Sequence, residues 1–345
     1  MNDREINGTP FAGEPRRRIA ELLGETGVGA FDRLGVGTAQ FGNLGQATTE
    51  EQVDAVMESA WEAGLRYFDT APHYGLGLSE RRLGQRLGDL PREEYILSTK
   101  VGRLLRPHPW PTETDLDNGF AVAGDLYRER DYTGAGMRRS LEESLKRLGL
   151  DRVDILWIHD PEETEDQTDI ALASGAPELE RMRQEGLFSA WGVGSKDAAV
   201  LRRFVDESTP DLLMVSGRHT LLEQDQVGLM GRCLDQGVGV VAVSVFNSGV
   251  LASPWPKDGV WYEYGPAPRE VLERARTLAR IAEGYGIDLP TAALQFPLRH
   301  PAVVNVTVGM RTADHVTSNL HRAGTAVPEA FWDQLHRDGL LPADA

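Results

Sequence analysis

Cysteine is nearly absent from this 345-residue chain, in which Cys233 is the only one. A single thiol excludes internal disulfides and the thiolate clusters that hold structural zinc. Nowhere do about 18 apolar residues follow one another, as a membrane-spanning helix requires. The basic run Arg16–Arg18 is not followed by an apolar segment that would make it a signal peptide. We therefore expect a cytoplasmic protein that makes no membrane contact.

Positive charge is also in short supply. The chain has 36 lysines and arginines against 53 aspartates and glutamates, which gives a net charge of −17 and a pI near 4.9. Such a surface repels nucleic acid and acidic lipid at long range, so we expect no nucleic-acid partner. An anionic cofactor remains compatible, because a helix N-terminus with a local cation suffices to bind a phosphate.

Two glycine-rich nucleotide-binding motifs are missing. Gly35 and Gly37 are followed by Gln40 in place of a third glycine, a second pair ending at Gly194 fails in the same way, and G-x-x-x-x-G-K does not occur. These absences argue against a Rossmann fold and against a P-loop.

A metal centre is not expected either. His159 and Asp160 end one predicted strand. Neighbouring residues of a strand point to opposite faces, so both would not easily bind one ion. A metal-dependent barrel hydrolase or isomerase stays open as an alternative, which chelation would test.

What the sequence does contain is a set of short apolar runs that end on polar side chains. One run ends at Asp69 and is followed by Tyr74 in a Pro/Gly-marked loop; two later runs end at Lys100 and at His159. Parallel strands place their C-terminal ends on one face, and neighbouring strands lie about 4.8 Å apart. We therefore expect these four side chains to converge in one pocket.

The apolar runs alternate with helix-period segments, which is typical of parallel βα units. Eight such units predict a single (β/α)8 TIM barrel over residues 31–345, preceded by a polar lead-in over residues 1–30. The predicted strands cover 34–42, 67–69, 95–100, 153–160, 188–195, 212–215, 238–246 and 303–308. The predicted helices cover 50–63, 79–87, 136–148, 178–184, 198–205, 223–235, 268–285, 292–299 and 312–321.

Long loops are predicted after the third and seventh strands. The first holds Trp110 and Phe120, and the second holds Trp255 and Trp261. Loops this long in a compact domain are usually functional or mobile, so the first is a candidate lid over the catalytic face. The aromatic residues either line a pocket for a ring-shaped substrate or only cover apolar surface.

The four converging side chains suit general acid–base chemistry. A phenol is a poor proton exchanger at neutral pH, but a nearby lysine ammonium favours the phenolate, so Lys100 is expected to lower the pKa of Tyr74. Asp69 would keep Lys100 charged and oriented, while His159 positions a substrate oxygen. This suits carbonyl reduction or alcohol oxidation with a nicotinamide as the hydride carrier. Taken singly, each residue has a structural interpretation, as a turn cap, a packed ring or a surface charge.

The motifs around these residues resemble those of the aldo-keto reductase family. They are Phe68-Asp69-Thr70-Ala71, Tyr74-Gly75, Ser98-Thr99-Lys100-Val101, Leu148-Gly149-Leu150 and Val153-Asp154-Ile155-Leu156-Trp157-Ile158-His159. The resemblance runs from about Leu34 to Asn319. It implies a (β/α)8 barrel that uses NADP or NAD, with Tyr74 as proton donor or acceptor, Asp69 and Lys100 tuning it, and His159 orienting the substrate.

The same resemblance implies cofactor-binding residues, mostly at the ends of the later strands. They are Thr38, Asp69, Ser195, Ser244, Gly309, Arg311, His315 and Asn319. The segment that enters the last predicted helix at Thr312 would take a phosphate at the helix N-terminus. Alternatively it is an ordinary strand-to-helix turn with a surface arginine.

Several positions depart from the family pattern. Lys196 stands where many members have asparagine after serine, Ser244 where an aromatic residue commonly stacks on the nicotinamide, and Ser216 where glutamine is expected. His315 stands at a usually basic position beside the adenosine 2′-phosphate. The resemblance therefore implies a looser preference for NADP over NAD, unless Arg311 compensates.

Within the family, the segment from Asp69 to Arg82 and Val245-Phe246-Asn247-Ser248-Gly249 resemble the branch of aldose 1-dehydrogenases and pyridoxal 4-dehydrogenase. The expected function is oxidation of the anomeric hydroxyl of a small aldose, or a related sugar or aldehyde conversion. Pyridoxal oxidation is one alternative, and a nicotinamide-sensing module without efficient turnover is another. The residues fix neither the direction of the reaction nor the oligomeric state.

Overall fold

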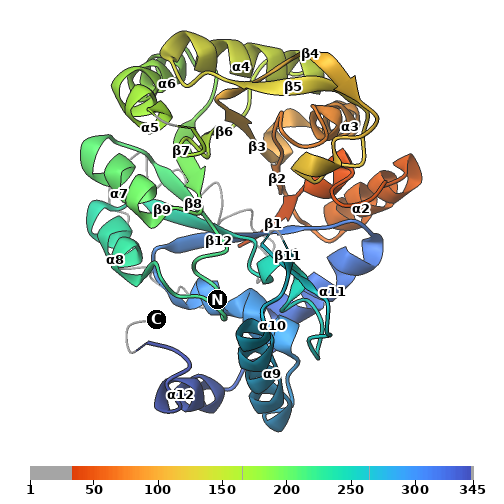
Figure 1. Cartoon of the computed structure of the whole chain (residues 1–345), viewed down its shortest axis with the longest axis vertical. Coiled ribbons are helices and arrows are strands. Elements are labelled where there is room, and N and C mark those ends of the chain that lie inside the picture. The colour runs from red at the N-terminus through yellow and green to blue at the C-terminus, as the bar shows by residue number, and fades with distance from the viewer. Residues whose placement is uncertain (1–32, 165, 264, 343–345) are drawn as a thin grey trace, which may run out of the picture.

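The computed structural model describes residues 33–164, 166–263 and 265–342, so the lead-in expected over residues 1–30 lies outside the described residues. Parallel strands close into a barrel in the order β1-β12-β9-β8-β7-β6-β3-β2 (Figure 1). The predicted single (β/α)8 barrel is confirmed. The barrel strands are β1 (Leu34–Gly37), β2 (Tyr67–Asp69), β3 (Ile96–Val101), β6 (Ile155–His159), β7 (Ala190–Ser195), β8 (Leu212–Ser216), β9 (Gly239–Val243) and β12 (Val303–Gly309).

Helices follow the strands around the barrel (Figure 1). They are α2 (Glu50–Glu62), α3 (Leu78–Leu87), α4 (Gly134–Leu148), α5 (Gln167–Ile170), α6 (Ala176–Gln184), α7 (Ala198–Glu207), α8 (Val227–Gln236), α9 (Arg269–Gly284), α10 (Leu289–Gln295), α11 (Ala313–Gly324) and α12 (Glu329–Arg337). Side-chain caps fix several starts: Thr49 and Gln52 form a capping box on α2, and Asp197 caps α7. Helix α12 was not predicted, and the first strand is shorter than expected because residues 39–42 form a 3₁₀ turn.

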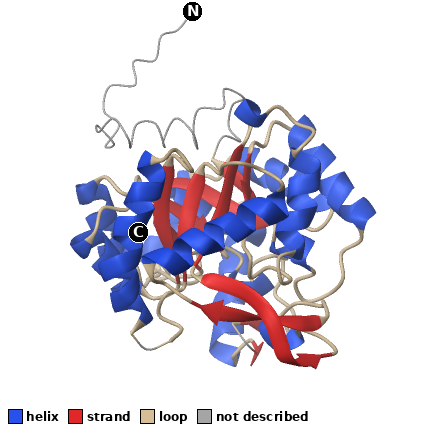
Figure 2. Ribbon diagram, turned by 90° about the horizontal axis from the view of Figure 1, so that it is seen from above, coloured by secondary structure: helices blue, strands red, loops and turns tan. Residues whose placement is uncertain are grey.

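The long segment after β3 is a hairpin, where the sequence predicted a loop. Strands β4 (Arg103–Thr112) and β5 (Gly124–Arg130) pair antiparallel, and Figure 2 shows this long pair across one end of the barrel. In the segment after β9, the described residues form a 3₁₀ turn over Asn247–Gly249 and the two-residue strands β10 (Trp261–Tyr262) and β11 (Gly265–Pro266). Both excursions occur where long loops were predicted, but the first has much more regular structure.

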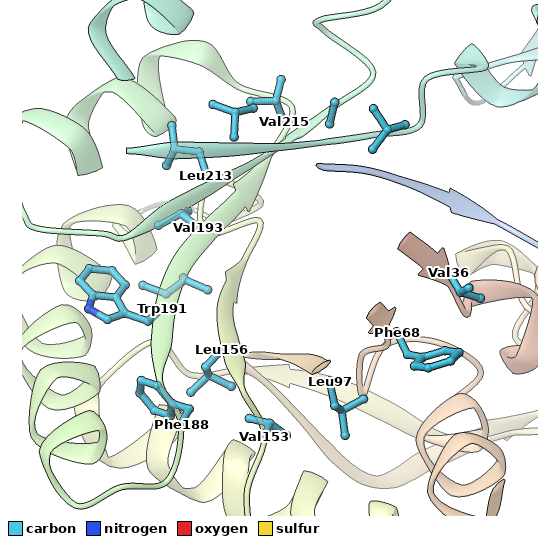
Figure 3. Close-up of a cluster of buried hydrophobic side chains, with 14 of the residues drawn as sticks. Val36, Phe68, Leu97, Val153, Leu156, Phe188, Trp191, Val193, Leu213 and Val215 are labelled. Carbon is cyan, nitrogen blue, oxygen red and sulfur yellow. The ribbon is translucent and has the colours of Figure 1, made fainter. Parts of the chain in front are cut away.

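Alternation along the strands divides the core into two layers. Leu156 and Leu213 belong to the large cluster between barrel and helices, part of which appears in Figure 3. Their strand neighbours Ile155, Trp157 and Leu212 belong to a separate cluster inside the barrel. Because successive side chains of a strand point to opposite faces, this pattern fixes which residues point inward all the way to the strand ends.

Two glycines bring the loops after β1 and β2 into contact. A Cβ atom at Gly75 would lie 2.2 Å from the carbonyl oxygen of Gly42, and one at Gly42 would lie 2.5 Å from the carbonyl carbon of Tyr74. Gly75 also has φ of 61°. A side chain at either position would force the loop that carries Tyr74 away from the first strand.

No helix in the described part of the chain is long and apolar enough to cross a membrane. Cys233 lies buried on α8, and its burial raises the pKa of the thiol to about 12.

Candidate active site

The inward positions of three adjacent strands end on the polar side chains that the sequence singled out. Tyr67 begins the inward series of β2 and Asp69 is its next member; on β3, Ile96 leads in steps of two to Lys100. On β6 the same steps lead from Ile155 and Trp157 to His159. Strands β2, β3 and β6 are neighbours in the barrel, so the three side chains meet at its mouth.

Asp69 and Lys100 form a buried ion pair. The Nζ atom of Lys100 lies 2.5 Å from Oδ2 of Asp69 and also donates to the carbonyl oxygen of Thr70 at 3.0 Å. The hydroxyl of Ser98 donates to Oδ1 of Asp69 at 2.6 Å. Lys100 is only 2% exposed and Asp69 3%. A buried pair is tolerated when further hydrogen bonds satisfy its free lone pairs and protons, and these two partners supply them.

Tyr74 lies on the turn after β2 and is only half-buried, unlike Asp69, Lys100 and His159. The Lys100 Nζ atom lies 4.8 Å from the centroid of its ring. The backbone of the turn is fixed, because the amide of Tyr74 donates to Ala71 and its carbonyl accepts from Ser79. Of the four side chains, Tyr74 is therefore the one with most surface open to a substrate.

The charges around Tyr74 act in opposite directions. Burial raises the pKa of the phenol, the Lys100 ammonium lowers it, and the Asp69 carboxylate raises it; the resulting pKa lies above the ordinary value. Lys100 thus lowers the pKa of Tyr74 as expected, but burial and Asp69 outweigh the ammonium, so the net shift is upward. For Lys100, burial lowers the pKa of the ammonium, but Asp69 and Tyr74 outweigh burial and raise it. At neutral pH the Tyr74 phenol is therefore neutral and lies beside the charged ammonium of Lys100.

His159 completes the group in its neutral form. Its ring lies 6.2 Å from the Tyr74 ring, centroid to centroid, at an interplanar angle of 85°. Burial, together with the charges of Arg103 and Lys100, holds the pKa of His159 well below its ordinary value. A neutral imidazole can donate one hydrogen bond and accept another, as needed to orient a substrate oxygen.

Asp160, next in the chain, does not point away from His159 as strand alternation suggested. The Oδ2 atom of Asp160 lies 3.3 Å from Nε2 of His159, because Asp160 lies past the strand end with φ of 44°. Even so, no group of three or more histidine, cysteine or acidic side chains suited to a metal ion occurs among the residues that the structure describes.

The hairpin β4–β5 directly contacts the turn that carries Tyr74. Arg128 of β5 forms a double hydrogen bond with Asp115, at 2.8 and 2.5 Å, and donates to the carbonyl oxygen of His73 at 2.9 Å. Phe120, between the two strands, packs its ring 5.1 Å from that of His73 and 6.1 Å from that of Tyr74. The hairpin is thus attached to the residue that precedes Tyr74.

The side chains implied as cofactor ligands near β1 and β7 have partners within the protein. The Thr38 hydroxyl is buried and bonds the carbonyl of Asp69 and the hydroxyl of Ser79, both at 2.8 Å. The Ser195 hydroxyl donates to Oε1 of Glu162 and accepts from the amide of Asp197. The Thr38 hydroxyl therefore links the end of β2 to Ser79 of α3. The Ser195 hydroxyl is bonded to the carboxylate of Glu162, which the sequence did not single out.

Near β9 and β12 the implied ligands are more accessible. Ser244 is exposed, with φ of 56°, and its hydroxyl pairs with that of Ser216 at 3.1 Å. Gly309 is exposed at the end of β12, and a Cβ atom there would lie 2.4 Å from the amide nitrogen of Gln40. The Oε1 atom of Gln40 is buried and has no hydrogen-bond partner in the described residues. Gly309 therefore lets the Gln40 side chain pack closely against the end of β12, and Oε1 of Gln40 is left able to accept a hydrogen bond.

The N-terminus of α11 carries the remaining implied ligands. Arg311 donates to the carbonyl of Gln46 and to the hydroxyl of Thr48, both at 2.9 Å. The amide of Arg311 donates to Nδ1 of His315 at 3.3 Å, and Asn319 accepts from a neighbouring arginine. Burial and the charge of Arg311 lower the pKa of His315, so its imidazole is neutral at neutral pH. A cation at a helix N-terminus suits an anionic ligand.

Three features of the site lay outside the sequence interpretation. They are the ion pair of Arg128 with Asp115, the approach of Asp160 to His159, and the link between Glu162 and Ser195. The run Gly124–Arg130 lacks the alternation of apolar and polar residues that would mark a strand, and no pattern in the sequence links Arg128 to Asp115.

A parallel eight-stranded barrel with acid–base side chains at the C-terminal ends of its strands is typical of a barrel enzyme, and these side chains suit carbonyl or alcohol chemistry. The model of the Aldo/keto reductase family matches residues 33–337. The chain therefore belongs to the aldo-keto reductase family, and it is an NAD(P)-dependent oxidoreductase. The exposed Gly309, the α11 N-terminus and Arg311 fit the phosphates of such a cofactor.

Individual relatives support this membership. The chain is 47% identical to D-threo-aldose 1-dehydrogenase of a Pseudomonas species, over 91% of this chain and 95% of the relative. It is 33% identical to pyridoxal 4-dehydrogenase of Microbacterium luteolum, over 92% and 97% respectively. Among solved structures, an aldo-keto reductase from Bacillus halodurans in its holo form matches with a TM-score of 0.72 and 24% identity, covering 90% and 92%. This last likeness concerns the fold.

Proposed function

We propose that this protein is an aldose 1-dehydrogenase, which oxidises the anomeric hydroxyl of a small aldose to a lactone. The observation that carries the proposal is the convergence of Tyr74, the Lys100–Asp69 pair and His159 at the barrel mouth. The 47% identity to D-threo-aldose 1-dehydrogenase favours a sugar as the substrate. We still expect the protein to act in the cytoplasm. We also expect it to take a small-molecule substrate and to have no nucleic-acid partner.

The four side chains divide the proton chemistry among them. A bound nicotinamide accepts the hydride in oxidation and supplies it in reduction. In oxidation, the phenolate oxygen of Tyr74 takes the hydroxyl proton; in reduction, the phenol returns a proton to the carbonyl oxygen. Lys100, held charged by Asp69, stabilises the phenolate that oxidation requires. Neutral His159 donates to the substrate oxygen and fixes its distance from Tyr74.

The preference between NAD⁺ and NADP⁺ depends on the charges at the N-terminus of α11. His315 is neutral at neutral pH and adds no positive charge, so Arg311 would be the cation that meets a 2′-phosphate. Its guanidinium is already hydrogen-bonded to the loop after β1. We therefore propose that the enzyme accepts both NAD⁺ and NADP⁺, with Ser244, Gly309 and Asn319 on the cofactor side of the mouth.

Oxidation of pyridoxal is the second candidate. The 33% identity to pyridoxal 4-dehydrogenase favours it. So does the position of Phe120, whose ring packs near those of His73 and Tyr74, since an aromatic wall suits a flat ring.

One assay separates these candidates. Purified protein is mixed with NAD⁺ or NADP⁺ and with L-fucose, D-arabinose, L-galactose or pyridoxal, and reduced nicotinamide is followed by absorbance. Turnover should fall by about 10²- to 10⁴-fold in Tyr74→Phe, while cofactor binding is retained. Tyr127→Phe, on the exposed face of the hairpin, is the matched control and should keep its activity.

The outcomes are distinct. Turnover on a sugar supports the aldose proposal, and turnover on pyridoxal alone supports the second candidate. Full activity in Tyr74→Phe would defeat the mechanism, and cofactor binding without any turnover would favour the sensing module. Because the pKa of Tyr74 is raised, oxidation should also become faster as the pH increases through the alkaline range.

A further inference from the structure

Asp160 is placed at the barrel mouth by an unusual turn. It follows His159, the last residue of β6, and its φ of 44° is in the left-handed region that aspartate tolerates better than most residues. The turn reverses the direction that strand alternation would give its side chain. The carboxylate therefore reaches the side of the strand on which His159 lies, with Oδ2 at 3.3 Å from Nε2.

The position of this carboxylate is fixed by buried groups. Arg103, which is 3% exposed, donates from Nη2 to Oδ2 of Asp160 at 2.7 Å. The hydroxyl of Tyr132 donates to the backbone carbonyls of His159 and Asp160, and the amide of Asp160 donates to Gly194. Side chain and backbone are thus both held, which is the condition for a group that selects between ligands.

One oxygen of the carboxylate remains available. The Asp160 side chain is 27% exposed, and no hydrogen bond reaches its Oδ1 from the residues that the structure describes. An ionised carboxylate accepts hydrogen bonds and cannot donate them. A hydroxyl that donates to a carboxylate forms a shorter and stronger bond than one between neutral groups. Oδ1 is therefore suited to a substrate hydroxyl close to the atom that His159 contacts.

We propose that Asp160 is a specificity-determining residue that accepts a hydrogen bond from the hydroxyl on the carbon next to the reacting carbon. The enzyme then selects 2-hydroxyaldehydes and aldoses over their 2-deoxy counterparts. The inference rests on the proposed function in one respect: it takes Tyr74 and His159 as the place where the reacting oxygen binds.

The test uses two small aldehydes that differ only in this hydroxyl. Reduction of lactaldehyde and of propanal is measured with reduced cofactor, and the ratio of their kcat/KM values is compared between proteins. In the unmodified enzyme lactaldehyde should be preferred by about tenfold to a hundredfold, the range for a hydrogen bond to a charged group. In Asp160→Asn the preference should fall to about threefold or less.

The matched control is Glu163→Gln. Glu163 also pairs with Arg103, at 2.8 Å, so this variant perturbs the same arginine without removing the Asp160 carboxylate. It should keep the preference for lactaldehyde. Cofactor binding by each variant is titrated by tryptophan fluorescence, which identifies a variant that has not folded. If Asp160→Asn has not folded, Asp160→Ala takes its place.

Three results would overturn the proposal. They are an unmodified enzyme that does not distinguish the two aldehydes, an asparagine variant that keeps the full preference, and an equal loss on both substrates. The last would mean that Asp160 acts only by positioning His159. Absence of any aldose turnover in the sugar assay would instead defeat the aldose proposal, and the aldehyde ratio would still be measurable.

Discussion

The two excursions over the barrel mouth are attached in different ways. The hairpin β4–β5 is joined to the turn that carries Tyr74 through Arg128, which donates to the carbonyl oxygen of His73 at 2.9 Å. Asp115, which lies in the same excursion, holds Arg128 in place, and the two side chains are 4% and 5% exposed. The segment that carries β10 and β11 is joined to the ends of β7 and β8 through Glu263, which pairs with Lys196 at 2.5 Å and Arg218 at 3.0 Å. Those three side chains are 24–38% exposed.

The ion pair of the hairpin is more deeply buried than the ion pairs of Glu263, and this implies that its loss costs more stability. Exposed ion pairs typically contribute no more than about 1 kcal/mol, whereas removing one partner of a buried pair costs about 3–5 kcal/mol. The first excursion is therefore held in its own shape by a strong buried pair that also supports its contact with His73, and its role as a lid stays a prediction. The second is the one whose attachment can be released at little cost.

The largest effect is expected from Arg128→Ala. The substitution leaves the Asp115 carboxylate buried without its partner and releases the carbonyl of His73, so it should lower the free energy of unfolding by about 3–5 kcal/mol. Displacement of Tyr74 should also lower kcat by roughly a hundredfold, because small misplacements of catalytic groups are costly. Urea denaturation and steady-state kinetics measure the two effects.

Arg106→Ala is the control on the same hairpin. Arg106 pairs with Glu129 at 2.9 Å and with Glu143 of α4 at 3.0 Å, and these side chains are 25–45% exposed, so its loss should change stability by about 1 kcal/mol. Equal effects of the two substitutions would mean that burial does not distinguish the two pairs.

A smaller, pH-dependent effect is expected in the cluster beneath the second excursion. His219 packs 5.3 Å from the ring of Phe296, and its burial lowers the pKa to about 4. In the unfolded chain the His219 imidazole takes up a proton near pH 6.5, whereas in the folded state it takes up the proton only near pH 4. Stability from this group is therefore present above pH 6.5 and is lost as the pH falls, by about 3 kcal/mol in all.

Substitution by glutamine removes this titration. In His219→Gln the decline of the unfolding free energy between pH 6.5 and pH 4 should be smaller by that amount. Part of the remaining decline would come from His73 and His159, whose pKa values are also held well below the ordinary value by burial. An unchanged pH profile would show that His219 takes up its proton in the folded state.

The smallest effect is expected from Glu263→Gln. The charge that joins Lys196 and Arg218 is lost, but the side chains are partly exposed, so stability should change by less than about 1 kcal/mol. The dissociation constant of the cofactor should change by less than about fivefold, which fluorescence titration can resolve. A change as large as that of Arg128→Ala would make the two excursions equivalent.

The catalytic half of the site was predictable because strand geometry alone places it. Asp69, Lys100 and His159 each end an inward-facing series with a period of two, and parallel strands put their ends together. Tyr74 followed from its position in the turn after β2. None of this needs information from distant parts of the chain.

The other features depend on tertiary contacts that have no local signal. Arg128 and Asp115 look like ordinary surface charges in the sequence, and only the folded hairpin buries them together. The turn at Asp160 reverses a direction that strand periodicity predicts. The net pKa shift of Tyr74 depends on the burial of the phenol, which strand periodicity does not give. Cofactor contacts remain a prediction for the same reason.

The buried thiol of Cys233 has a practical consequence. With its pKa raised to about 12, it is almost entirely protonated at neutral pH and unreactive toward alkylating probes. Because the chain has no other cysteine, one introduced at Trp110, which is 80% exposed near the hairpin tip, would be labelled alone. A single dye or spin label could then report on the hairpin during turnover without removal of any native residue from the core.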